Sequence, residues 1–372
     1  MGIFQTESLG FQTAQNEKAI NKLNSVPINY VNSKIHYPAL DGLRGVAVIS
    51  VILYHVLHFR PGWMGVDLFF VLSGFLITSI LIDTKSATGY FKNFYVKRML
   101  RIFPLYYGTL LVFFIPFLLN HSDTIISKAL PYFGYVQNIS FTISNQWPVD
   151  SMSPLNHFWS LAIEEQFYIF FPLVIYFVRD RALPIVLGLL VILTIACRCW
   201  FYFGLHNPVG CYVFTFCRID GLLIGALANL YARNFKSVRI EYLLLTLIAV
   251  VIIAGINMDF TNPLFSTFGY TINALFFASM LLIGLSQKTY VSRFLNNRVV
   301  RHFGKYSYGL YVFHHIYFIL INYVVVTRFN ETSATQYLIP LITLAATYIT
   351  ALLSFHFFEA PILRLKKKFV SV

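Results

Sequence analysis

Long apolar runs alternate with short polar gaps along most of the chain. Ten runs are long enough to cross the hydrocarbon core of a bilayer, which requires about 20 predominantly apolar residues in a helix. They lie at 42–59, 64–82, 102–119, 157–178, 183–203, 212–232, 241–257, 266–285, 307–326 and 337–357. The pattern predicts an all-α polytopic membrane protein with about ten transmembrane helices.

The further apolar segment 129–145 is interrupted by Pro131, Gly134, Gln137 and Asn138. If this segment does not span the membrane, every strongly basic gap lies on the same side as the N-terminus. These gaps are 83–101, 179–182, 233–240 and 286–306, together with the C-terminal tail. By the positive-inside rule both termini are then cytoplasmic. We therefore expect 129–145 to be a broken or re-entrant element that protein buries.

Composition supports this assignment, with 57% hydrophobic and 12% charged residues. The net charge of +13 does not indicate nucleic-acid binding, because the basic residues cluster in the gaps between apolar runs. The four cysteines lack the paired spacing of a zinc or redox site, so we expect inert core thiols and no metal.

The chain divides into three parts. Residues 1–36 are polar and lack the apolar core of a signal peptide, so we expect a cytoplasmic tail there. The membrane domain is expected at 37–365, and 366–372 form a basic cytoplasmic tail.

The first apolar run carries Arg44 and His55, which are 11 positions apart. That spacing places both side chains on one helical face, about 16 Å apart along the axis. One face thus connects the membrane interface with the membrane interior. An arginine at a helix end and a histidine satisfied in the core are the alternative for each residue alone.

A basic cluster formed by Lys97, Arg98 and Arg101 precedes Pro104. Arg98 and Arg101 share a helical face, where two guanidinium groups could bind phosphate. A positive-inside anchor explains the charge equally well.

The segment 155–171 contains His157, Ser160, Glu164 and Tyr168, which follow at helical spacing and line one face. Carboxylates inside a span cost about 2.5 to 3.5 kcal/mol each, which argues for a function. The neighbouring Glu165 points about 100° away, so we expect it to face a loop or another helix. A hydrogen-bond network without chemistry is the alternative.

Two later segments also carry polar side chains. Arg218 and Asp220 are two apart and do not face each other on a helix, so each needs a partner from another span. Structural ion pairing is the alternative to a functional role. Ser307, Tyr311 and His314 form a helical stripe, with His315 beside it.

The chain resembles the integral-membrane acyltransferase 3 family in seven blocks that occur in the same order, from about residue 36 to 365. The blocks are YPALDGLRGVAVISVILYH (37–55), FFVLSGFLIT (69–78), FYVKRMLRIFPLYY (94–107), LNHFWSLAIEEQFY (155–168), RIDGLLIGAL (218–227), SYGLYVFHH (307–315) and FFEAP (357–361). Family members often carry a proline shortly after the last histidine stripe, where this chain has Ile316 and Tyr317. This departure puts the local helix geometry in question.

The resemblance implies a membrane O-acyltransferase that takes an acyl group, usually acetyl, from cytoplasmic acyl-CoA to a hydroxyl of a carbohydrate or lipid-linked glycan. It implies Arg44 and His55 as essential residues, and Arg98 and Arg101, with Lys97, as acyl-CoA contacts. Glu164 matches the glutamate after the block that contains Trp159. Supporting or substrate contacts are expected from His157, Trp159, Tyr168, Arg218, Asp220, Ser307, Tyr311 and His314.

These observations combine into one hypothesis. His55 is the expected general base, Arg44 holds the donor or the thioester oxygen, and Glu164 orients a histidine or the acceptor. An acyl-histidine intermediate is a variant. We expect no permanently bound cofactor, membrane lipids as surroundings, and the inner membrane of a bacterium as location. A glycan-precursor transporter or a ligand-sensing scaffold are the competing functions.

Overall fold

The computed structural model describes residues 25–27, 37–119, 123–149, 152–234, 237–239, 262–285, 289–329 and 333–365. The expected span 241–257 lies outside the described residues, as do the expected tails except for 25–27. The described part is helical apart from two three-residue strands, β1 (Ser25–Pro27) and β2 (Ser237–Arg239), which pair antiparallel.

Eight helical segments of the described part are long and apolar enough to cross a membrane, and they correspond to eight of the expected runs. They are built from α2 (Pro38–Leu57), η1 and α3 (Arg60–Met64 and Gly65–Thr84), α4 (Tyr90–Leu119), η2 and α7 (Ser153–Phe158 and Trp159–Phe177), α8 and η3 (Leu183–Cys199 and Trp200–Gly204), η4 and α13 (Phe265–Gly269 and Tyr270–Leu285), α16 (Ser307–Phe329), and α17, η5 and α18 (Ser333–Ser354, Phe355–Glu359 and Ala360–Arg364). The prediction of an all-α polytopic membrane protein is confirmed.

The predicted span 212–232 does not form one continuous helix. The chain forms α9 (Pro208–Val213), α10 (Thr215–Arg218) and α11 (Asp220–Asn234) instead. Phe214 between α9 and α10 has an extended backbone with ψ 132°, which ends the first helix. Arg218 and Asp220, which follow the break, form ion pairs with residues of other helices.

The segment 129–145 is broken, as expected. It forms α5 (Asp123–Phe133) and α6 (Gln137–Ser144), and Tyr135 between them adopts a left-handed backbone with φ 53°. Gln137 and Asn138, which made this segment a poor span, are fully buried and hydrogen-bonded to the backbone carbonyls of Phe158 and Val213. Protein therefore satisfies the polar groups of this element.

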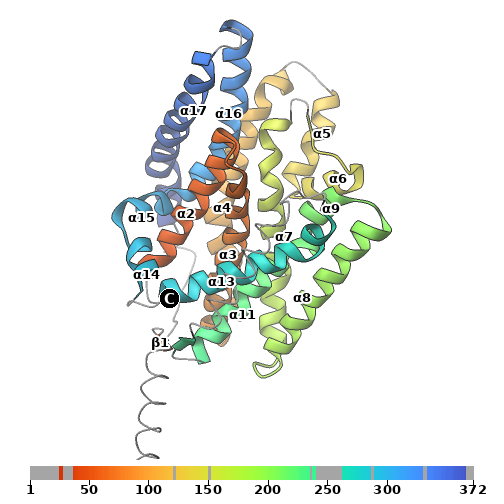
Figure 1. Cartoon of the computed structure of the whole chain (residues 1–372), viewed down its shortest axis with the longest axis vertical. Coiled ribbons are helices and arrows are strands. Elements are labelled where there is room, and N and C mark those ends of the chain that lie inside the picture. The colour runs from red at the N-terminus through yellow and green to blue at the C-terminus, as the bar shows by residue number, and fades with distance from the viewer. Residues whose placement is uncertain are drawn as a thin grey trace, which may run out of the picture.

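The helices that carry the polar residues pack side by side in one bundle (Figure 1). α2 lies between α3 and the short helices α14 (Tyr290–Leu295) and α15 (Arg298–Lys305), while α16 packs against α17. α3 and α11 approach at two glycines. A Cβ atom on Gly74 would lie 1.8 Å from the Leu222 carbonyl oxygen, and one on Gly225 would lie 2.1 Å from that of Val71. The two backbones are therefore in direct contact.

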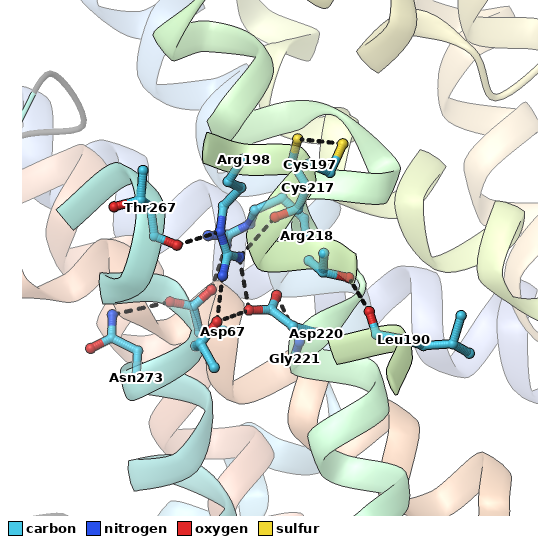
Figure 2. A network of polar contacts seen from close by, with 12 residues as sticks. Asp67, Leu190, Cys197, Arg198, Cys217, Arg218, Asp220, Gly221, Thr267 and Asn273 are labelled. Carbon is cyan, nitrogen blue, oxygen red and sulfur yellow. Dashed lines mark hydrogen bonds and ion pairs between the residues drawn. The ribbon is translucent and has the colours of Figure 1, made fainter. Parts of the chain in front are cut away.

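Two buried ion pairs connect α3, α8, α10 and α11 (Figure 2). Arg218 pairs with Asp67 of α3, whose second carboxylate oxygen accepts a hydrogen bond from Asn273 at 3.2 Å. Arg198 of α8 pairs with Asp220 at 2.7 Å and also donates to the carbonyl oxygens of Thr267 and Cys217. The prediction that Arg218 and Asp220 need partners from other helices is confirmed.

Candidate active site

A first cavity of about 280 Å³ lies between α2, α3, α4, α7 and α16. Four cationic side chains line it, Arg44 from α2 and three residues of α4. The α4 residues are Lys97, Arg98 and Arg101, which the helical spacing placed together. A cationic cavity of this composition can bind phosphate or another polyanion through charge-assisted hydrogen bonds.

The cations are held in different ways. Arg44 forms an ion pair with Asp41 one turn earlier on α2, with 2.9 Å between Nη1 and Oδ1. The Arg98 guanidinium lies over the ring of Tyr168, 4.7 Å from its centroid. The stacking holds the Arg98 plane without consuming its N–H groups, which leaves them able to donate to a ligand.

Both intramembrane glutamates line the same cavity. Tyr168 donates a hydrogen bond to Glu164 at 3.0 Å and also contacts the Ser73 hydroxyl. Glu165, which we expected to face a loop or another helix, is 8% exposed and lines this cavity between the helices. The cavity thus contains two carboxylates opposite four cations, which can hold a ligand and balance part of the positive charge.

A second cavity of about 380 Å³ lies further along α2. His55 lines it, together with His157 from η2 and His315 from α16. Much of its remaining wall is aromatic, formed by Tyr54, Trp63, Trp147, Trp159, Tyr212, Phe265, Tyr270 and Tyr311. The 11-residue spacing of Arg44 and His55 therefore places them in two different cavities along one helix.

Four histidine rings, three of which line the second cavity, lie close together. The centroid of the His55 ring lies 4.5 Å from that of His315 and 5.2 Å from that of His314. The His157 ring lies 4.9 Å from His314 and 5.3 Å from His315. Among the residues that the structure describes, no three His, Cys, Asp or Glu side chains are placed to hold one metal ion.

Backbone carbonyls determine where three of these histidines carry their protons. His157 Nε2 lies 3.1 Å from the Val312 carbonyl oxygen, His314 Nδ1 lies 2.7 Å from that of Tyr311, and His315 Nδ1 lies 3.2 Å from that of Pro154. A carbonyl oxygen only accepts, so each of these nitrogens donates, and the other nitrogen of the neutral ring is an acceptor. The neighbours of His55 therefore present lone pairs.

The two cavities share a wall at Val66 and Tyr311. The Tyr311 hydroxyl lies 2.5 Å from the Ser160 hydroxyl and donates to the His157 carbonyl oxygen at 2.9 Å. Phe69 packs edge-on against the Tyr311 ring, with 5.8 Å between the centroids. A few side chains thus separate the cationic cavity from the histidine cavity.

The structure brings most of the sequence-predicted residues to these two cavities. The first contains Arg44, Lys97, Arg98, Arg101, Ser160, Glu164, Tyr168, Ser307 and Tyr311, and the second contains His55, His157 and Trp159. His314 is fully buried behind His55. α16 continues without a break past Ile316 and Tyr317, so the missing proline does not disturb the helix.

Two expectations need revision. Glu164 lines the first cavity and bonds Tyr168, while the histidines line the second, so its contacts do not support a role in orienting a histidine. Arg218 and Asp220 line neither cavity and belong to the ion-pair network, although Arg218 lies 4.0 Å from the centroid of the Tyr270 ring. The contacts of Arg218 and Asp220 therefore favour structural ion pairing over a functional role.

Sequence reasoning missed most of the aromatic wall and underrated His315. Trp63, Trp147, Tyr212 and Tyr270 come from four separate segments, so no local spacing relates them. His315 lies beside the predicted stripe, and the supporting role was predicted for its neighbour His314 instead. The adjacent histidine pair was the one signal available for it.

The fold and the two cavities together define a polytopic membrane protein with a polar site inside its helix bundle. A family model described as an acyltransferase domain matches residues 37–357. The chain belongs to the acyltransferase 3 family, and the family resemblance of its sequence blocks is confirmed.

Curated relatives are bacterial. The chain is 33% identical over 359 residues to the peptidoglycan O-acetyltransferase OatA of Listeria monocytogenes, with 89% of this chain and 56% of the relative covered. It is 34% identical to a Bacillus subtilis protein provisionally named a peptidoglycan O-acetyltransferase (88% and 55% covered). It is 30% identical to a Staphylococcus aureus protein provisionally named an O-acetyltransferase (88% and 58% covered).

The chain thus spans little more than half the length of these relatives. No solved structure matches the chain.

Proposed function

We propose that the protein is a membrane O-acetyltransferase that moves an acetyl group from cytoplasmic acyl-CoA to a hydroxyl of a cell-surface or lipid-linked carbohydrate. The observation that carries this proposal is the meeting of a cationic cavity and a histidine cavity at Tyr311. The names of the relatives, which include peptidoglycan O-acetyltransferases, support a carbohydrate acceptor.

The donor is assigned to the first cavity. Acyl-CoA is a polyanion that cannot enter hydrocarbon, so its phosphates need a basic surface, and Lys97, Arg98 and Arg101 supply one. These residues belong to the basic gap 83–101, which the positive-inside rule places in the cytoplasm. The thin acyl-bearing arm would extend past Arg44 toward Tyr311, so that the thioester reaches the second cavity. Arg44 would then hold the donor arm and not the thioester oxygen, because it lies about 16 Å from His55 along the helix axis.

The reaction is assigned to the second cavity. The hydroxyl oxygen of the acceptor attacks the thioester carbonyl carbon while His55 takes the hydroxyl proton. The new C–O bond forms, the C–S bond breaks, and the proton from His55 returns to the CoA sulfur. The lone pair on His314 Nε2, which has no partner among the described residues, lies on a ring 5.2 Å from His55 and can stabilise the imidazolium. Attack by His55 itself, through an acetyl-histidine, is a variant of this scheme.

The transfer experiment uses purified protein in sealed vesicles, with radiolabelled acetyl-CoA on one side and a bacterial glycan extract as the acceptor. Label that becomes bound to glycan, and that requires acetyl-CoA on the side of α4 residues 97–101, supports both reaction and orientation. Protein that binds acetyl-CoA but labels no hydroxyl compound contradicts the reaction. Movement of unmodified glycan across the vesicle membrane would support the transporter instead.

Replacing Arg98 with alanine is expected to weaken acetyl-CoA binding on the order of tenfold to a hundredfold, because one charge-assisted phosphate contact is lost. The measurement is the concentration of acetyl-CoA that half-saturates thermal stabilisation of the detergent-purified protein. Arg181→Ala is the matched control, since Arg181 is exposed and lines neither cavity. Equal affinity for acetyl-CoA in Arg98→Ala and in the control would contradict the assignment of the donor to the first cavity.

A further inference from the structure

The second cavity contains polar atoms that the proposed reaction does not use. Asn156 Oδ1, His157 Nδ1 and the Tyr270 hydroxyl are buried, and none has a hydrogen-bond partner within the part of the chain that the structure describes. All three residues line this cavity. Buried polar atoms normally have hydrogen-bond partners, so three such atoms without a partner in residues that line one cavity indicate a polar ligand.

Two of these atoms can only accept a hydrogen bond. The Asn156 amide nitrogen donates to the Pro148 carbonyl oxygen at 2.8 Å, which orients Oδ1 as the free acceptor. His157 Nε2 donates to the Val312 carbonyl oxygen, which leaves a lone pair on Nδ1. The ligand must therefore bring at least two donors, and hydroxyl groups are donors that also match the Tyr270 hydroxyl.

The rest of the wall is unusually aromatic. Three of the chain's four tryptophans line this cavity, namely Trp63, Trp147 and Trp159. The Trp159 ring lies 4.8 Å from Tyr212 and 6.5 Å from Trp147, and the Trp63 ring lies 6.0 Å from Tyr270. Flat apolar faces beside hydrogen-bond acceptors fit a ring that has C–H groups on its faces and hydroxyls at its edge.

We infer that the second cavity is a subsite for one pyranose ring of the acceptor, stacked on the tryptophan faces and held by Asn156, His157 and Tyr270. This inference rests on the proposed function for the identity of the reaction, but the binding itself does not depend on transfer. The volume of about 380 Å³ falls within the range of small-molecule pockets, roughly 300–1,000 Å³. A hydroxyl of the bound ring then lies in the same cavity as His55.

The test exploits the distribution of tryptophans. Trp200 is 64% exposed and lines neither cavity, so Trp200→Phe removes the one remote fluorophore. Every remaining tryptophan then lines the second cavity. Tetra-N-acetylchitotetraose and cellotetraose are titrated into this protein in detergent, and mannitol is the polyol control that has hydroxyls but no ring. We expect a saturable fluorescence change with a tetrasaccharide and none with mannitol.

Two variants in this background test the residues. Asn156→Ala and Trp147→Phe are each expected to raise the half-saturating tetrasaccharide concentration about threefold to tenfold, from loss of a hydrogen bond or of stacking area. Half-saturation by acetyl-CoA should stay unchanged in both, which shows that they are folded. As a second measurement, the KM for the acceptor in the transfer assay should also rise in both variants.

The outcomes separate this inference from the proposed function. Transfer of acetyl to a tetrasaccharide without any tryptophan signal overturns the subsite and leaves the enzyme standing. A saturable signal that Asn156→Ala weakens, without transfer, supports the subsite and contradicts the enzyme. Neither signal nor transfer, or an equal response to mannitol, overturns the sugar subsite.

Discussion

Replacing His55 with alanine is expected to lower kcat for acetyl transfer by roughly 10²- to 10⁴-fold, the usual contribution of a general base. The side chain lines the second cavity, and the centroid of its ring lies 5.2 Å from that of His314 and 4.5 Å from that of His315. Acetyl-CoA binding should be unaffected, because the cationic residues lie in the other cavity. The measurement is initial rate at saturating donor and acceptor, with donor-dependent thermal stabilisation as the check on folding.

The matched control comes from the same helix end. His58 caps α2 in a left-handed conformation with φ 54° and is exposed, so His58→Asn keeps a residue that tolerates this backbone. We expect His58→Asn to retain its rate. Full transfer by His55→Ala would remove His55 from the mechanism, whether it acts as a base or as a nucleophile. Acid-quenched protein from a single turnover distinguishes the two, since only a nucleophile leaves acetyl on the histidine.

The second large effect concerns stability. Asp220→Asn is expected to lower the free energy of unfolding by about 3–5 kcal/mol, because Arg198 would remain as an uncompensated charge with no exposed side-chain surface. The measurement is unfolding in mixed micelles with increasing SDS, followed by circular dichroism. The pair of Arg233 and Asp83 is the control, since both side chains are partly exposed and Asp83→Asn should cost about 0–1 kcal/mol.

A double substitution sharpens this prediction. Arg198→Met combined with Asp220→Leu removes both charges, so it should be less destabilising than the sum of the single substitutions. It will not recover fully, because Arg198 also satisfies the carbonyl oxygens of Thr267 and Cys217. Additive losses would show that the two charges do not depend on each other.

Helical periodicity predicted what lies on one helix. It placed Arg98 with Arg101, and these two residues share the first cavity. It also placed His157, Ser160, Glu164 and Tyr168 on one face; the last three share the first cavity, while His157, which belongs to η2, lines the second. It also identified 129–145 as broken, because proline, glycine and amide side chains interrupt the run. Within one helix, the neighbours of a residue follow from the 3.6-residue turn alone.

Contacts between helices could not be predicted in this way. Arg218 and its partner Asp67 are 151 positions apart, and nothing in either segment specifies the other. The aromatic cavity is similar, since Trp63, Trp147, Tyr212 and Tyr270 meet only after the helices pack. The same limit applies to Glu164, which was expected to orient a histidine or the acceptor. Its helix contributes to both cavities, and only packing decides which cavity each turn faces.

The wall formed by Val66 and Tyr311 also has an electrical consequence. With the proposed orientation, a continuous water path between the two cavities would let ions and protons run down the membrane potential, which is worth about 2.3 kcal/mol per charge for each 100 mV. The hydroxyl of Tyr311 is hydrogen-bonded to Ser160 and to the His157 carbonyl oxygen, which holds this side chain in the wall between the two cavities. Three of the nearby histidines each direct a proton to a carbonyl, and a hydrogen-bond wire cannot continue through an oxygen that only accepts. Under the proposed function, the acyl group would have to pass this wall without opening a continuous water path for ions or protons.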